Sequence, residues 1–246
     1  MKSILYSAWK KKPHMMSKKI ILITGASRGI GHATARYLAG QKHQVLATAR
    51  SEQLLEELKA TNTRRIDYVA CDLLDAASLQ KIIDYIRDQN VEISALIHNA
   101  GGLINKPFRD LTDQDWNAMW NMNVLTAVRL LRALLPFFAK NAHIVTIGSM
   151  GGFQGSSKYP GLSAYSTSKG ALSIWSESMA TELKDEGISV NCLCLGAVQT
   201  EMFSSAFPGM KAPVKPDEMA QFVGDFALKG HSFMNGKVLP VTLGDP

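Results

Sequence analysis

The chain has 246 residues, of which 46% are hydrophobic and 20% are charged, ordinary values for a single globular domain. Its formal net charge of +6 comes from the first 19 residues, which hold six lysines and no acidic residue. The rest of the chain is neutral, which argues against a general nucleic-acid-binding surface. Because we find no apolar run of transmembrane length and no signal-peptide pattern, we expect a cytoplasmic protein without a membrane partner.

Residues 1–18 form the basic segment, which we expect to be a disordered tail, and residues 19–246 carry the folded domain. From residue 19 onward, short apolar runs alternate with segments of helical periodicity. The predicted strands are residues 19–24, 44–49, 65–70, 93–98, 143–148, 188–195 and 237–242. The predicted helices are residues 29–39, 51–60, 75–88, 112–139, 163–185 and 216–228.

Several of these strands are apolar on both faces, as in a sheet that helices cover on both sides. Regular alternation of strands and helices predicts an α/β fold, with a doubly wound parallel sheet in one Rossmann-like domain. Gly40 and Gly187 lie where the C-caps of two helices are expected. Residues 196–216 are rich in glycine and proline, and we expect a mobile loop there, over a site.

Three cysteines, Cys71, Cys192 and Cys194, lack the spacing of a metal site, and we expect no metal. Cys192 and Cys194 lie two residues apart in an apolar run, so they would share one face of a strand. We interpret all three as small buried side chains in a reducing compartment rather than as a redox pair.

A glycine-rich loop, Thr24-Gly-Ala-Ser-Arg-Gly-Ile-Gly31, follows the first predicted strand and opens the first predicted helix. Small residues at Gly25, Gly29 and Gly31 permit a tight turn and let the backbone approach a pyrophosphate at the helix N-terminus. The spacing differs from the common G-x-G-x-x-G pattern, and a simple strand-to-helix turn is the alternative interpretation.

The second predicted strand ends in Ala49 and Arg50, where sites for NAD place an acidic residue against the ribose hydroxyls. Arg50 and Arg28 offer two guanidinium groups that can bind a 2′-phosphate, so we expect NADP(H) to be favoured, with NAD(H) possible. Two solvated surface arginines are the alternative. Asp72 follows the third strand, where it would either bind an adenine amino group or cap a helix.

Tyr165-Ser-Thr-Ser-Lys169 places a tyrosine and a lysine four residues apart, on one face of a predicted helix. The spacing alone is weak evidence, because Tyr6 and Lys10 repeat it in the basic tail. The stronger evidence is that this pair follows the glycine loop, Asn99-Ala-Gly101 and Ser149 in that order along the chain. On these motifs the chain resembles the short-chain dehydrogenase/reductase family, of the TGxxxGxG and YxxxK type, from about residue 19 to residue 242.

The resemblance implies a role for each matching residue. Gly25, Ser27, Arg28, Gly29, Ile30 and Gly31 would surround the phosphates, Asp72 and Leu73 the adenine, and Asn99, Ala100 and Gly101 the adjacent ribose. Asn123, Ser149, Tyr165 and Lys169 would form the catalytic group, with Tyr165 and Lys169 also at the cofactor, and Gly196, Val198 and Thr200 would hold the nicotinamide. The chain departs from the family at Leu195, usually proline, and at His98, often asparagine.

In this interpretation Lys169 lowers the pKa of Tyr165, which then exchanges a proton with the substrate oxygen. Ser149 would hold that oxygen as charge builds on it, and Asn123 would anchor a water that resupplies the proton through Lys169. Met150, Phe153, Met202, Phe203 and Phe207 are candidates for an apolar pocket wall.

We therefore expect an NADPH-dependent carbonyl reductase acting on a small-molecule carbonyl or alcohol substrate whose identity the sequence leaves open. An alcohol dehydrogenase that uses NADP or NAD in the oxidative direction is one alternative, and a non-catalytic nucleotide-sensing protein is another. The resemblance also implies a homo-oligomer, a tetramer or dimer, formed through the long helices near 112–139 and 163–185.

Overall fold

The structure, a computed structural model, describes residues 18–243. Of the expected tail at 1–18, residues 1–17 therefore lie outside the described residues, and Lys18 is the first residue of a strand and not part of a disordered tail. Seven parallel strands form one sheet in the order β3-β2-β1-β4-β5-β6-β7. The strands are β1 (Lys18–Thr24), β2 (Val45–Ala49), β3 (Ile66–Ala70), β4 (Val91–His98), β5 (Phe138–Ser149), β6 (Ser189–Leu195) and β7 (Val238–Val241). The helices are α1 (Gly29–Gly40), α2 (Glu52–Thr61), α3 (Ala76–Asp88), α4 (Asp113–Trp120), α5 (Thr126–Leu134), α6 (Ser163–Glu182), α7 (Glu201–Ala206) and α8 (Pro216–Lys229).

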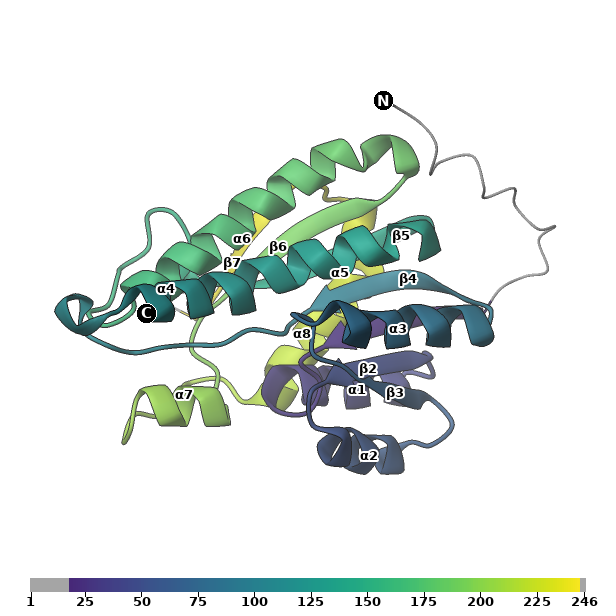
Figure 1. Cartoon of the computed structure of the whole chain (residues 1–246), viewed down its shortest axis with the longest axis horizontal. Coiled ribbons are helices and arrows are strands. Elements are labelled where there is room, and N and C mark those ends of the chain that lie inside the picture. The colour runs from purple at the N-terminus through teal and green to yellow at the C-terminus, as the bar shows by residue number, and fades with distance from the viewer. Residues whose placement is uncertain (1–17, 244–246) are drawn as a thin grey trace.

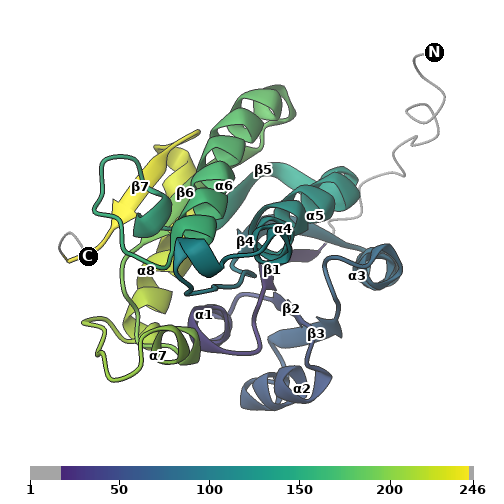
Figure 2. The same cartoon turned by 60° about the vertical axis from the view of Figure 1, so that its left-hand side comes forward.

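Helices cover both faces of the sheet, and each face has its own apolar core (Figures 1 and 2). In β1, Ile21 and Ile23 belong to the core under α1, α2 and α8, whereas Ile20 and Leu22 belong to the core under α3, α5 and α6. Successive side chains of a strand point to opposite faces of the sheet, and here both faces are buried. The strands are therefore continuous apolar runs in the sequence. The prediction of a doubly wound parallel sheet is confirmed.

The observed elements differ from the predicted ones at three places. The helix predicted over 112–139 is α4 and α5 joined by a π-helical turn, Asn121–Leu125, and it ends at Leu134. Pro136 accounts for the early end, because proline lacks a backbone donor and restricts the residue before it. Strand β5 accordingly begins at Phe138, five residues earlier than expected.

The other two differences concern loops. The stretch expected to be an irregular loop contains the short helix α7, which stands beyond the ends of the strands (Figure 1). After α1 it is Lys42, with φ of 69°, that takes the left-handed conformation rather than Gly40. Gly187, with φ of 74°, does end a helical segment as expected.

The sheet order reverses direction between β1 and β4, since β2 and β3 lie on one side of this pair and β5 to β7 on the other. In open α/β sheets, ligands bind at such a switch point, outside the carboxyl ends of the strands. Thr24, His98 and Ser149 end β1, β4 and β5, so the loops after them form this edge. Within residues 18–243, no helix is both long and apolar enough to cross a membrane.

Candidate active site

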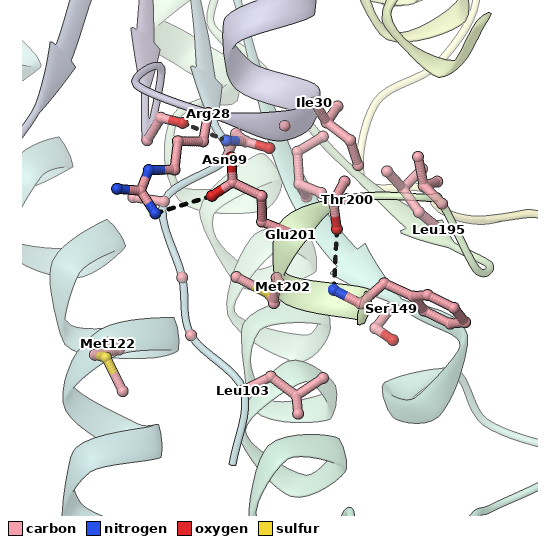
Figure 3. Close-up of a pocket in the computed structure, with 18 of the residues that line it drawn as sticks. Arg28, Ile30, Asn99, Leu103, Met122, Ser149, Leu195, Thr200, Glu201 and Met202 are labelled. Atoms are coloured by element: carbon pink, nitrogen blue, oxygen red, sulfur yellow. Dashed lines mark hydrogen bonds and ion pairs between the residues drawn. The ribbon is translucent and has the colours of Figure 1, made fainter. Parts of the chain in front are cut away.

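A cleft of about 1130 Å³ lies along the carboxyl ends of the strands (Figure 3). Almost all of the predicted site residues line it. They are Gly25, Ser27, Arg28, Gly29, Ile30, Arg50, Asp72, Leu73, Asn99, Ala100, Gly101, Ser149, Tyr165, Lys169, Gly196, Val198 and Thr200. Gly31 and Asn123 do not line the cleft, and both have structural contacts behind it.

The glycine loop owes its shape to two left-handed residues, Gly25 with φ of 66° and Gly29 with φ of 56°. A Cβ at Gly25 would lie 2.9 Å from the Cα of Ala100, so no other residue fits this position without a shift. The Asn99 side-chain amide donates to the carbonyl oxygens of Thr24 and Gly25, both at 3.1 Å, which ties the loop to the end of β4. The loop is thus an open backbone cradle at the start of α1, of the kind that accommodates a pyrophosphate.

Gly31 serves packing rather than the cleft itself. A Cβ there would lie 2.5 Å from the Asn99 Nδ2 and 2.5 Å from the Gly25 carbonyl oxygen. Because the first turn of α1 presses directly on the loop and on Asn99, a side chain at Gly31 would force them apart.

The side of the cleft next to β2 carries the two candidate phosphate-binding arginines. Arg50 is exposed at the end of β2. Arg28 instead forms an ion pair with Glu201, with 2.9 Å between its Nη1 and Oε2 of the carboxylate (Figure 3). Asp72 accepts a hydrogen bond from the Leu74 backbone at 2.9 Å, whereas Asp75 is the N-cap of α3, so the helix-cap alternative for Asp72 is wrong.

Ser149, Tyr165 and Lys169 meet where the end of β5 packs against the start of α6. The Ser149 hydroxyl accepts a hydrogen bond from the Gly151 amide at 3.1 Å, which fixes the oxygen at the edge of the cleft. The Lys169 ammonium donates to the Ile147 carbonyl at 2.8 Å, and the side chain is only 5% exposed. The hydroxyl groups of Ser149 and Tyr165 and a buried cation therefore face the same space.

The pKa of Tyr165 is raised above its ordinary value of 10, because burial of the hydroxyl outweighs the lowering by the Ser149 hydroxyl. The expected lowering by Lys169 is therefore wrong for the chain on its own. The physical reason is that the Lys169 ammonium is directed at the Ile147 carbonyl instead of the phenol. A raised pKa keeps the Tyr165 hydroxyl protonated at neutral pH, and it can then act as a proton donor.

Burial lowers the pKa of Lys169 from 10.5 to about 8, while the neighbouring thiols of Cys192 and Cys194 act in the opposite direction. Both cysteines are fully buried on one face of β6, as expected. His98, also buried, has its pKa lowered to about 3 by desolvation and by the Lys169 charge, so its ring is neutral. Its ring nitrogens lie 3.2 Å from the Thr24 hydroxyl and 3.3 Å from the Thr126 hydroxyl.

Asn123 lies in the π-helical turn and is fully buried. Its side chain accepts from the Gly102 amide at 2.9 Å, donates to the Gly102 carbonyl at 3.0 Å, and donates to the Ser168 hydroxyl at 2.9 Å. A Cβ at Gly101 would lie 2.6 Å from the Asn123 Oδ1 and 3.2 Å from the Lys169 Nζ. Asn123 thus joins the loop after β4 to α6, directly beside Lys169.

The side of the cleft next to β6 is built by the segment after Leu195. Gly196 packs on Thr242, since a Cβ there would lie 2.5 Å from the Thr242 hydroxyl oxygen. Val198 is buried and pairs with Val214, and the Thr200 hydroxyl accepts from the Phe203 amide at 3.1 Å to cap α7. Leu195 continues the ladder to Val241, so the departure from proline leaves the strand intact.

Apolar side chains from several elements also line the cleft, among them Leu103, Met122, Met150, Met202, Phe203 and Phe207. Phe153, which we expected among them, lines a neighbouring hollow beside Arg109 instead. Leu103, Met122 and Glu201 were not predicted as site residues. No local pattern marks them, because the loop at Leu103, the π-helical turn at Met122 and helix α7 at Glu201 are brought to the cleft by the tertiary structure.

The residues present suit a dinucleotide and not a metal ion. The backbone cradle at Gly25 and Gly29, the exposed Arg50 and the polar group at Ser149 and Tyr165 line one continuous cleft. No group of three or more histidine, cysteine or acidic side chains lies close enough to hold a metal within the part of the chain that the structure describes.

The buried Lys169 predicts a pH dependence of stability. Between pH 8 and 10.5 the native state releases the Lys169 proton while the unfolded chain retains it, so this group's contribution to stability rises with pH. The free energy of unfolding of the wild type, minus that of Lys169→Met, should rise by up to about 1.4 kcal/mol per pH unit in this window. Urea unfolding of both proteins at pH 7.5, 8.5 and 9.5 measures it, and a constant difference would contradict the burial of a charged ammonium.

Comparison with known proteins places the chain in a family. The family model described as short chain dehydrogenase matches residues 19–211. The chain is 30% identical to the 3-oxoacyl-[acyl-carrier-protein] reductase FabG of Escherichia coli (strain K12), over 92% of this chain and 96% of that protein.

Solved structures share the fold. A 3-ketoacyl-(acyl-carrier-protein) reductase from Brucella melitensis complexed with NADH has a TM-score of 0.82 at 23% identity, covering 93% of this chain and 98% of that one. An NADPH-bound short-chain oxidoreductase from Pseudomonas aeruginosa PAO1 has a TM-score of 0.83 at 24% identity, covering 92% and 95%. With the family model matching most of its length, the chain belongs to the short-chain dehydrogenase/reductase family of oxidoreductases.

Proposed function

We propose that this protein is an NADPH-dependent carbonyl reductase in which Tyr165 is the proton donor. The observation that carries the proposal is the meeting of Ser149, Tyr165 and Lys169 at one end of a cleft whose other end is the glycine loop. The family's oxidoreductase character supports it, as does the curated relative from Escherichia coli, whose name describes a reductase of a 3-oxoacyl group.

In this proposal Gly25, Gly29 and Ile30 hold the phosphates, and Asp72, Leu73, Asn99 and Ala100 hold the adenosine half. Gly196, Val198 and Thr200 hold the nicotinamide, which when bound would supply the hydride. The glycine-loop backbone supports this assignment, because the left-handed Gly25 and Gly29 leave the loop without side chains there.

The residues of the chain supply the proton and the electrostatic support. The Tyr165 hydroxyl donates its proton to the substrate oxygen, while the Ser149 hydroxyl donates a hydrogen bond to the same oxygen as negative charge builds on it. We assign Lys169 to the ribose next to the nicotinamide and to the proton path, and Asn123 holds the loop and helix beside it and would anchor the water that returns the proton through Lys169.

The Tyr165 hydroxyl is protonated at neutral pH, as donation to a carbonyl requires, and we propose the reductive direction. The apolar wall of Leu103, Met122 and Met202 fits an uncharged, largely apolar carbonyl compound. We place the protein in the cytoplasm, since the reaction draws on a soluble nucleotide.

Replacing Tyr165 by phenylalanine tests the proton donor. Tyr165→Phe keeps the ring and removes the hydroxyl, so kcat for carbonyl reduction should fall by about 10²- to 10⁴-fold. The dissociation constant of NADPH should stay within about threefold. Tyr159→Phe is the matched control, because Tyr159 lines the same cleft and loses the same group. A panel of ketones and aldehydes, monitored by NADPH oxidation, measures both variants, and near-normal turnover in Tyr165→Phe would refute the assignment.

Cofactor choice is tested at Arg50. A charge-assisted hydrogen bond is worth about 1.5–3 kcal/mol, so Arg50→Ala should weaken NADPH binding about tenfold or more and change NADH binding little. Arg36→Ala, an exposed arginine of α1 outside the cleft, is the control. Titration of each nucleotide gives the dissociation constants, and a wild type that binds NADH as tightly as NADPH would remove the basis for the preference.

We also propose a homo-oligomer that uses the face of α4, α5 and α6. Trp120 on α4 is 46% exposed and Ile174 on α6 is 66% exposed, so each of these helices leaves a large apolar side chain that a second subunit could cover. Trp175 and Met179, by contrast, pack on the core. Light scattering at micromolar concentration should give at least twice the 26.9 kDa chain mass, and Ile174→Glu should lower it. A wild-type mass of one chain would contradict the proposal.

A further inference from the structure

The Arg28–Glu201 ion pair joins two segments of the cleft wall that are far apart in the sequence. Arg28 precedes α1 in the glycine loop, and Glu201 is the first residue of α7. Their nitrogen and oxygen atoms lie 2.9 Å apart, with side-chain exposures of 62% and 69%. Both residues line the main cleft, and the pair spans it from the loop to α7 (Figure 3).

The position of Glu201 is set by its neighbour in the chain. Thr200 caps α7 by accepting a hydrogen bond from the Phe203 amide, and its methyl group lies against the glycine loop. A Cβ at Gly29 would be only 3.2 Å from the Thr200 Cγ2, so these segments are in direct contact. The backbone that carries Glu201 is therefore held next to the loop that carries Arg28, and the carboxylate lies within reach of the guanidinium.

The order of the strands places the ion pair relative to Arg50. In the sheet, β2 and β6 lie on opposite sides of β1. Arg50 follows β2, Arg28 follows β1 and Glu201 follows β6, so Arg28 starts from a strand that lies between the strands of the other two residues. A 2′-phosphate bound by both arginines would have to lie between Arg50 and Arg28, whereas in the structure the Arg28 guanidinium is paired with the Glu201 carboxylate. An anionic phosphate and an anionic carboxylate thus compete for one cation.

We propose that Glu201 is a specificity-determining residue that lowers the preference for NADPH over NADH by competing with the 2′-phosphate for Arg28. The inference rests on the proposed nucleotide-binding function of this cleft. An exposed ion pair is weak, so the pair competes with the phosphate without excluding it, and the expected effect is a few-fold change in affinity.

The test compares Glu201→Gln, Arg28→Gln and the double variant with the wild type. Glutamine keeps the shape of the side chain and removes the charge, and Glu201 is exposed, so the fold should be retained. Glu182→Gln, an exposed acid at the end of α6 that lines neither hollow, is the matched control. Dissociation constants for NADPH and NADH are measured by titration, with 2′,5′-ADP and 5′-AMP as probes of the adenosine half alone.

We expect Glu201→Gln to tighten NADPH about three- to tenfold more than NADH and to tighten 2′,5′-ADP relative to 5′-AMP by a similar factor. In the Arg28→Gln background, Glu201→Gln should leave two ratios of dissociation constants unchanged, NADPH to NADH and 2′,5′-ADP to 5′-AMP. An equal gain for both nucleotides would overturn the inference, because Glu201 would then act on the shared pyrophosphate. A wild type that binds both nucleotides, with ratios that Glu201→Gln does not alter, overturns this inference alone. A wild type that binds neither nucleotide overturns the proposed function as well.

Discussion

The contact between Gly152 and α6 is the constraint on which the relative positions of Ser149, Tyr165 and Lys169 depend. A Cβ at Gly152 would lie 2.5 Å from the Gly170 amide nitrogen and 2.6 Å from the Lys169 carbonyl carbon. The backbone that follows Ser149 therefore touches the backbone of the helix that carries Tyr165 and Lys169. Because this approach leaves no room for a side chain, the distance between the end of β5 and the first turns of α6 is fixed by backbone contact and not by adaptable side chains.

The close contact between the backbone after β5 and α6 also buries the charged side chain of Lys169, a residue type that is rarely buried. The ammonium of Lys169 is almost completely buried and its pKa is depressed, so at neutral pH it is a charge held in the interior at a cost in stability. The Ile147 carbonyl offsets part of that cost by accepting a hydrogen bond. A core built for stability alone would place an apolar side chain here, which is why the lysine is best understood through the chemistry of the cleft.

The sequence predicted the layers of the fold because the central strands are buried on both faces and the helices that cover the sheet are buried on one. Burial of this kind leaves a periodic apolar pattern in the sequence. Most site residues were predictable too, since the ends of parallel strands must meet at one edge of the sheet. Features that depend on a few tertiary contacts were not. Pro136 ended a helix that periodicity alone extended, and α7 lies outside both cores, so it leaves little apolar pattern.

Glu201 illustrates what no local pattern could reveal. Its partner Arg28 lies 173 residues away in the chain, and the two segments meet where Thr200 packs on Gly29. Besides these contacts, α7 is linked to the loop after β4 by the Asn105 side chain, which donates to the Ala206 carbonyl at 2.8 Å. Ser149, Tyr165 and Lys169 thus belong to elements fixed by the two cores, whereas α7 is attached at the rim of the cleft by the Thr200–Gly29 contact, the ion pair and this hydrogen bond. Substitutions in α7 can therefore change which ligand is admitted without moving Ser149, Tyr165 or Lys169, and selectivity can vary while the chemistry is kept.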